Sequence, residues 1–126
     1  MNILLPRIES SELAENKSEE QGWYIAYTQP QREQLAQINL TIQGFEVYLC
    51  QYKAFKKSLD GLIAVWQPMF PRYIFFRPAH AGQSISVVHS TRGVAYVLRF
   101  GVTPAMLKSS EICMIRALEN AQNQTD

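Results

Sequence analysis

The sequence predicts an α+β fold in which an antiparallel β-sheet of about four strands is flanked by helices. Three observations predict this class. Short aromatic and β-branched segments alternate between two faces, two longer segments repeat apolar residues at helical spacing, and an Asp60-Gly61 pair joins two strand-like segments. With 126 residues, of which 47% are hydrophobic and 18% charged, the chain fits one domain around one core.

The first strand and the first helix have the clearest signals. Residues 23–28, WYIAYT, alternate aromatic and β-branched side chains between two faces. Pro30 suits a first helical turn because its missing N–H has no partner to lose there, and Gly44 supplies a stop. Between them apolar residues recur at helical spacing, so we expect a helix from about Gln31 to Gln43.

The middle of the chain is expected to form three further strands. FEVYLCQY at 45–52 and LIAVWQ at 62–67 are strand-like, and KKSLDG at 56–61 is typical of the turn of a hairpin between them. Two prolines then interrupt pairing before the next strand, YIFFR at 73–77.

The last third of the domain contains a further strand and a helix. Residues 79–88 fit either a short helix or a loop. GVAYVLRFG at 93–101 is predicted to be a strand that alternates between two faces. One of these faces should carry Val94, Tyr96, Leu98 and Phe100. After Pro104, two serines and Glu111 are expected to open a final helix.

Both ends of the chain are polar. Residues 1–21 are rich in Glu, Ser and Asn and are expected to be a flexible tail ahead of a domain at 22–120. Residues 121–126 are polar and without periodicity, and are expected to begin a linker.

Charge, cysteine content and hydropathy exclude several classes of protein. In residues 1–22 two basic and five acidic side chains give −3, and in the remainder ten basic and six acidic give +4, which is far from the basic stripe of a stand-alone nucleic-acid binder. Cys50 and Cys113 lack metal-ligand spacing, so we expect two buried thiols and no metal. The N-terminus has neither a signal peptide nor a membrane span, which predicts a cytoplasmic protein.

The residue types and spacings that carry catalysis are missing. The sequence has no GxSxG, no HExxH, no paired carboxylates and no phosphate-binding glycine loop. His80 and His89 lie in or beside polar turns, where a surface role is expected. We therefore expect a protein that is not an enzyme and holds no cofactor.

An aromatic run, QPMFPRYIFFRP at 67–78, is the most informative segment. Tyr73 and Phe75 should point to one side of the strand, and Ile74 and Phe76 to the other. If helices cover both sides, both pairs are core; if one side is open, one pair forms an aromatic patch. Aromatic residues on an open sheet also suit a single-stranded RNA-binding module, although the signature of RNA-binding sheets is absent.

Three segments resemble the N-terminal domain of the NusG family of transcription elongation factors. They are WYIAYTQPQREQLAQINL, PMFPRYIFF and STRGVAYVLRFG, in this order, and the likeness covers about residues 22 to 120. The most specific parts are the FPxY core at 70–73 and the TRGV element at 91–94, and the likeness is greatest to RfaH-like antiterminators. The resemblance implies a non-enzymatic factor that binds RNA polymerase and suppresses pausing or termination.

The resemblance also implies where RNA polymerase binds. In this family an apolar hollow receives the tip of the clamp helices of the largest subunit, while the opposite edge approaches the other large subunit across the DNA channel. Carried over by position, the hollow is lined by Tyr27, Pro71, Tyr73, Phe75, Phe100, Ile112 and Ile115. Tyr73 is the favoured anchor, and Arg72, at the variable place of FPxY, is expected to reach solvent.

Nucleic-acid contacts are implied at the start of the first helix and at the TRG arginine. In RfaH-like members these places contact the non-template DNA strand of the transcription bubble. They correspond here to Gln29, Arg32, Gln34 and Arg92, beside Pro30 and Gln31. Basic residues that precede the helix in those relatives are Gln29 and Pro30 here, which weakens the expected contact.

A second polymerase contact and a second domain complete the implied picture. Where RfaH-like relatives carry a His-Thr-Thr motif, this sequence has Ser84, Ile85 and Ser86. Family members also carry a C-terminal KOW-type β-barrel, which this sequence lacks. Where such a domain folds back as in RfaH, the same hollow would be its docking site.

Overall fold

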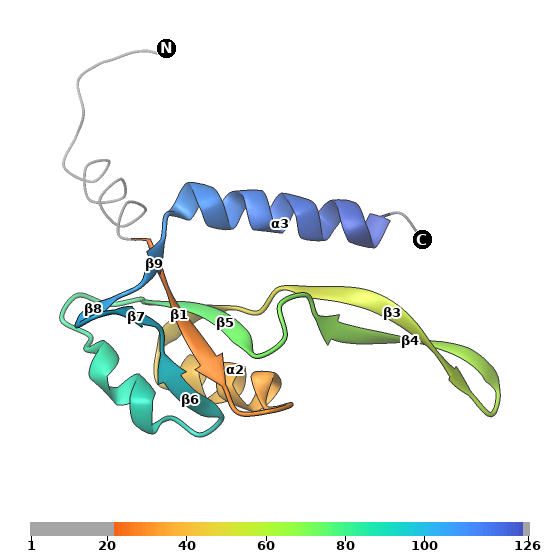
Figure 1. The fold of residues 1–126 in the computed structure, drawn as a ribbon, viewed down its shortest axis with the longest axis horizontal. Coiled ribbons are helices and arrows are strands. Elements are labelled where there is room, and N and C mark those ends of the chain that lie inside the picture. The colour runs from red at the N-terminus through yellow and green to blue at the C-terminus, as the bar shows by residue number, and fades with distance from the viewer. Residues whose placement is uncertain (1–21, 125–126) are drawn as a thin grey trace, which may run out of the picture.

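An antiparallel β-sheet lies at the centre of the computed structural model, which describes residues 22–124 (Figure 1). Its strands are β1 (Trp23–Thr28), β2 (Phe45–Tyr48), β5 (Tyr73–Pro78), β6 (Val94–Val97) and β9 (Met106–Leu107). They are ordered β2-β5-β1-β6, and β9 pairs with the beginning of β1. The predicted α+β class is confirmed. The expected flexible tail, residues 1–21, lies outside the described residues.

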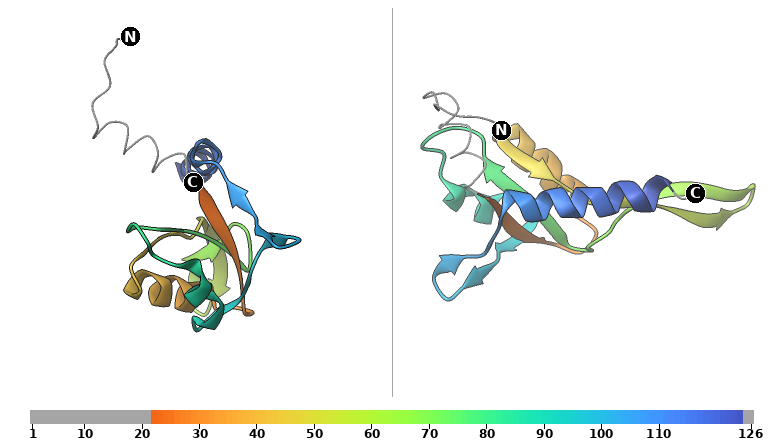
Figure 2. Two further views of the ribbon diagram at one scale, coloured as in Figure 1. Left: turned by 90° about the vertical axis from the view of Figure 1, so that its left-hand side faces the viewer. Right: turned by 90° about the horizontal axis from the view of Figure 1, so that it is seen from above.

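Helices cover the two faces of this sheet. Helix α2 (Glu33–Ile42) and the 3₁₀-helix η1 (Ile85–Ser90) lie on one side, and α3 (Ser109–Gln124) runs along the other (Figures 1 and 2). The ambiguous segment 79–88 is therefore a turn followed by the first part of η1. Within residues 22–124 no helix has the length and apolar character needed to cross a membrane.

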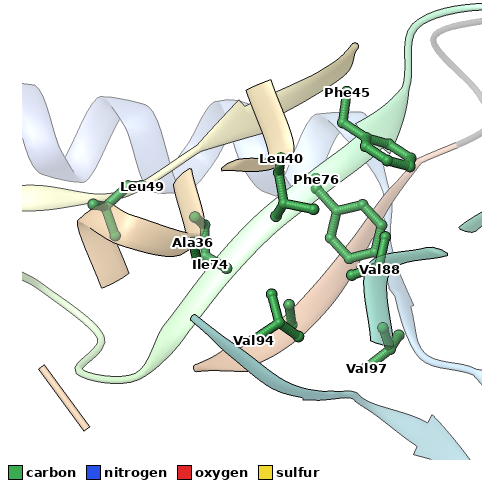
Figure 3. Close-up of a cluster of buried hydrophobic side chains, with 10 residues drawn as sticks. Ala36, Leu40, Phe45, Leu49, Ile74, Phe76, Val88, Val94 and Val97 are labelled. Carbon is green, nitrogen blue, oxygen red and sulfur yellow. The ribbon is translucent and has the colours of Figure 1, made fainter. Parts of the chain in front are cut away.

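The main core lies between the sheet and the pair formed by α2 and η1. Ile74 and Phe76 of β5 are fully buried there, and Figure 3 shows Phe76 beside Leu40 of α2 and Val88 of η1. The Phe76 ring is packed edge-on by Phe45 and stacked by Tyr24, with centroids 5.6 and 5.5 Å away. One set of the alternating residues in β5 is thus core, whereas on the other side Phe75 is buried and Tyr73 is exposed, so that side is covered only in part.

The predicted strand at 45–52 is interrupted in the structure. Strand β2 ends at Tyr48, Leu49 and Cys50 are buried without strand pairing, and β3 (Gln51–Ser58) pairs with β4 (Gly61–Pro68) in a separate two-stranded hairpin. Residues 56–58, expected in the turn, belong to β3, and only residues 59 and 60 connect the strands. This β3–β4 hairpin projects from the body of the domain (Figures 1 and 2).

The alternation predicted for residues 93–101 is wrong because β6 contains a β-bulge. Tyr27 pairs with Tyr96, whereas the next residue of β1, Thr28, pairs with Val94, so Ala95 is an extra residue. Val94 and Val97 consequently both face the main core. The expected strand also stops at Val97, and β7 (Arg99–Phe100) pairs with β8 (Thr103–Pro104) in a small separate sheet.

Helix α3 is longer than predicted. Residues 121–124 belong to it, where we expected a linker to begin. The Asn123 side chain explains part of this extension, because its Oδ1 accepts from the Lys53 N–H at 3.0 Å and its Nδ2 donates to the Gln51 carbonyl at 3.2 Å. Polar side chains of α3 thus satisfy main-chain groups at the base of the β3–β4 hairpin.

Candidate functional site

Three tyrosines form a row across three neighbouring strands. Tyr27 of β1 is paired with Tyr73 of β5 on one side and Tyr96 of β6 on the other. Their ring centroids are 5.2 and 5.0 Å from that of Tyr27, which is the spacing of rings in mutual contact. Tyr73 and Tyr96 are 37% and 48% exposed. This tyrosine row (Tyr27, Tyr73 and Tyr96) is therefore an open aromatic surface on a rigid sheet.

Helix α3 covers the neighbouring part of the same face. Ile112 packs on Trp23 and Phe75, and all three are buried, with Ile115 half-buried against them. Arg116 of the same helix lies over the Tyr48 ring at 4.7 Å, a cation–π contact that adds to the apolar packing. Phe75, Ile112 and Ile115, which we predicted to line the hollow, thus form a second core that borders the tyrosine row.

The other predicted members of the hollow are placed differently. Pro71 is exposed within the FPxY turn, two residues before Tyr73. Phe100 lies in the small β7–β8 sheet and is 79% exposed, so it is not part of the sheet that carries the tyrosines. Phe70, 38% exposed, packs edge-on against Phe75 at 6.3 Å and extends the aromatic surface in its place.

Sequence reasoning missed Tyr96 and Phe70 as surface members. Tyr96 stood in the alternating pattern of residues 93–101, but the bulge at Ala95 hid its pairing with Tyr27. Phe70 opens the FPxY element, where two flanking prolines suggested an interruption rather than a surface. The signal for Tyr96 is the register, because a residue directly opposite Tyr27 must share its face, whereas Phe70 precedes β5 and is placed only by its contact with Phe75.

Arg72 does not simply reach solvent, as we expected, but joins the FPxY turn to two other elements. Arg72 has a φ of 72° and follows Pro71. A proline followed by a residue of positive φ is typical of type II turns, in which glycine is preferred at the second of these two positions. Its N–H donates to Oε2 of Glu33 at 2.9 Å and its Nε to the Thr28 carbonyl at 3.0 Å. Its guanidinium lies 4.2 Å from the centroid of Tyr27. These contacts offset the strained backbone.

Gln29, Arg32 and Arg92 belong to the β1–α2 turn and the TRGV element, which are hydrogen-bonded to each other, whereas Gln34 faces the base of the β3–β4 hairpin. Gln29, Arg32, Gln34 and Arg92 are all exposed. The Gln29 N–H donates to the Gly93 carbonyl at 2.8 Å, and Asn39 of α2 donates to the Arg92 carbonyl at 3.4 Å. Arg92 is thereby held beside α2 with its side chain free to turn outward.

Gly93 makes this arrangement possible. Its φ is 97°, and a Cβ atom there would lie 2.7 Å from the Ala36 nitrogen and 2.9 Å from the Ala36 Cα. Both distances are shorter than any ordinary contact, so only glycine lets the TRGV element approach α2 so closely.

The segment Ser84, Ile85 and Ser86 begins η1. Ser84 is its N-cap and accepts from the Ser86 N–H at 3.1 Å, and the two hydroxyls are 2.8 Å apart. Ile85 is half-buried against the main core. The exposed surface of this predicted second contact therefore consists of the two serines.

Two titratable groups in the described chain have pKa values shifted by burial, and both have structural roles. Burial, followed by a hydrogen bond to Glu119, raises the pKa of the Tyr48 hydroxyl above its usual range. Burial also raises the pKa of the Cys50 thiol. Cys113 is exposed on α3, contrary to the expectation of two buried thiols. His89 is exposed and bonded to Arg99 at 2.8 Å, which agrees with the predicted surface role.

The described residues bring together three surfaces that are typical of a binding domain. These are the open tyrosine row, the apolar border beneath α3, and an adjoining polar edge formed by the β1–α2 turn and the TRGV element. No group of three or more metal-binding side chains occurs within residues 22–124. Residues 21–116 match the model of the protein family described as "Transcription termination factor nusG". This match spans most of the chain, so the chain belongs to the NusG family.

Membership in this family gives the general function. NusG-family proteins are termination or antitermination factors of transcription, they bind RNA polymerase, and they are not enzymes. The match is to the family as a whole and does not single out its RfaH-like subgroup.

Proposed function

We propose that this domain is an RfaH-like antitermination module of the cytoplasm that binds the clamp helices of the largest RNA polymerase subunit through the tyrosine row. The open row beside the α3 border is the observation that supports this assignment. Interfaces concentrate their binding energy in a few buried aromatic anchors surrounded by a polar rim. Tyr73 and Tyr96 have the exposure and the rigid support that such anchors need.

Pausing is suppressed, in this proposal, by selective binding to one state of the polymerase. A domain that contacts both sides of the DNA channel binds only the closed clamp, and it shifts the equilibrium toward that state by its difference in affinity. Ser84 and Ser86 supply the second contact through their hydroxyls, while Ile85 anchors the segment in the core. No bond chemistry is involved.

The polar edge at Arg92 is proposed to contact the non-template DNA strand. Arg92 and Arg32 contribute positive charge for phosphates, and Gln29 and Gln34 contribute amide groups for phosphates or unstacked bases. The short bond from Gln29 to Gly93 ties the two halves of this edge together, so they would move as a unit. A C-terminal domain in the same gene would compete with polymerase for the tyrosine row.

A second candidate function is the binding of single-stranded RNA by the sheet. The observation that favours it is the same row, because exposed aromatic rings on a sheet stack on bases. The two functions differ in salt dependence and in partner. RNA binding would weaken steeply as salt rises, since phosphate contacts release counterions, whereas apolar docking on polymerase would not.

The decisive experiment is a comparison of Tyr73→Ala and Phe100→Ala in polymerase binding and single-round transcription. If Tyr73 is an anchor, its truncation costs about 2 kcal/mol, or about 30-fold in affinity. It should also restore pausing. Phe100→Ala is a matched control, because Phe100 is an exposed aromatic outside the row. Undiminished binding by folded Tyr73→Ala would refute the proposed site, and a loss of RNA binding instead would favour the second candidate.

A further inference from the structure

A cavity of about 370 Å³ lies between the beginning of α2 and the base of the β3–β4 hairpin. We call it the glutamine pocket, because its walls include Gln31 and Gln34 from the α2 side and Gln51 and Gln67 from the hairpin. Its volume falls in the range of roughly 300–1,000 Å³ that is usual for small-ligand sites. Gln34 is also a predicted DNA contact and Pro71 a predicted polymerase contact, but Glu33 and the hairpin residues in its walls belong to neither set.

The only charged residue in the wall of the glutamine pocket is Glu33. Its side chain is part of a residue only 8% exposed, and Oε2 accepts from the Arg72 N–H at 2.9 Å. That single bond leaves Oε1 with capacity for a donor from a ligand. A buried carboxylate with no basic residue in the same wall disfavours phosphate and favours a cation.

The remaining walls combine hydrogen-bond acceptors with flat apolar surfaces. Each glutamine amide offers a carbonyl oxygen, and Tyr52, whose hydroxyl donates to Oε1 of Gln67 at 3.4 Å, contributes a ring. Pro68 and Pro71 complete the wall. The main chain of Gln51 is fixed by α3, since its N–H donates to Oε2 of Glu119 at 2.7 Å. The backbone at one of the four glutamines is therefore held in place.

We propose that the glutamine pocket receives the guanidinium group of an arginine side chain from a protein partner. A guanidinium carries only donors, in a plane, and it stacks on aromatic faces, which matches a carboxylate, amide oxygens and a tyrosine ring. An ammonium group holds its water more strongly and lacks the flat shape. A nucleotide would bring phosphate toward Glu33 without a compensating cation in the wall.

The partner is the one that binds the tyrosine row, so this inference rests on the proposed function. Pro71 lines the glutamine pocket and is followed, after Arg72, by Tyr73 of the row. Arg72 joins the two sites physically, because its N–H contacts Glu33 and its guanidinium covers Tyr27. A helix tip seated on the aromatic row would thus have the glutamine pocket within reach of a long side chain.

The direct test is an NMR titration of the whole chain with N-acetyl-arginine amide, N-acetyl-lysine amide and AMP. The arginine compound should produce saturable shifts of the side-chain amide signals of Gln34, Gln51 and Gln67, and the lysine compound smaller ones. Glu33→Gln should abolish the response while its amide oxygen still accepts from Arg72. No saturable response to the arginine compound, an equal response in Glu33→Gln, or a larger response to AMP would overturn the proposal.

A second variant and a second measurement keep the pocket separable from the polymerase site. Gln34→Lys places a competing cation at the exposed rim, so it should block the arginine response even if Glu33→Gln folds poorly. Tyr73→Ala should leave the arginine response intact. The Glu33→Gln variant should bind polymerase roughly tenfold more weakly than the wild type, because it loses the charge-assisted hydrogen bond from the partner's arginine to Glu33. If the wild type binds no polymerase, the proposed function fails and the titration alone decides on the pocket. An unchanged polymerase affinity in the Glu33→Gln variant would show that polymerase does not use the glutamine pocket.

Discussion

Replacing Gly93 by alanine should destabilise the domain more than the same change at a glycine with open space around it. The left-handed backbone, with φ of 97°, costs an alanine roughly 1–2 kcal/mol. The new Cβ would lie 2.7 and 2.9 Å from two main-chain atoms of Ala36, which is fully buried, so neither side can give way cheaply. Overpacking of this kind adds about 1–3 kcal/mol. We expect a total loss of about 3 kcal/mol in the free energy of unfolding.

Gly82→Ala is the matched control for this prediction. Gly82 has a similar φ of 80°, but a Cβ there would meet nothing within 4 Å. Urea unfolding of both variants, followed by circular dichroism, separates the backbone cost from the clash, because only Gly93→Ala has both. Equal losses in the two variants would show that the close approach to α2 carries no energy and would refute the reasoning. Gly93→Ala should also displace the neighbouring Arg92, the proposed DNA contact, and this loss should be visible in transcription assays.

Three further predictions concern the contacts that hold α3 and the FPxY turn. Glu119→Ala should reduce the hydrogen-exchange protection of the Gln51 amide and cost about 1 kcal/mol, since two half-buried donors lose their acceptor; unchanged protection would contradict this. The pKa of Tyr48 is raised by burial and then by Glu119, so its contribution to stability is complete below the ordinary tyrosine pKa of about 10 and is lost as pH rises above it. Alkaline unfolding should therefore be less steep in Tyr48→Phe than in the wild type. In urea unfolding, Arg72→Gly should be more stable than Arg72→Ala by about 1 kcal/mol. Both variants lose the contact with Thr28, but only glycine accepts the φ of 72° freely. The reverse order of stability would exclude backbone strain at this turn.

The fold class followed from patterns that local physics enforces. Alternation in residues 23–28 and 73–77 separated the two faces of the sheet correctly, because strands of this length have a period of two whatever they pair with. The break between β2 and β3 was not predictable in this way. Leu49 and Cys50 are apolar and continue the strand pattern, and only their burial without pairing reveals the corner.

The candidate site could be predicted in composition but not in assembly. The aromatic residues of the FPxY segment carry a family resemblance, and Tyr27 and Tyr73 lie together as that resemblance implied. Whether Phe75 is exposed depends on where α3 lies, and whether Phe100 belongs depends on where β6 ends. Both are set by contacts distant in sequence. The polar end of α3 is the same kind of case, since its helix is supported by bonds to β3 rather than by its own apolar pattern.

The bulge at Ala95 has a consequence for how this sequence can change over time. Val94 and Val97 face the core while Tyr96 faces outward. This arrangement requires the bulge, in which Ala95 is an extra residue of β6 without a partner in β1. Deleting Ala95 would leave every side chain chemically intact yet turn either a valine into solvent or a tyrosine into the core. At this point of the chain the number of residues therefore matters more to the fold than their identity, so deleting Ala95 should disrupt the domain more than substituting it.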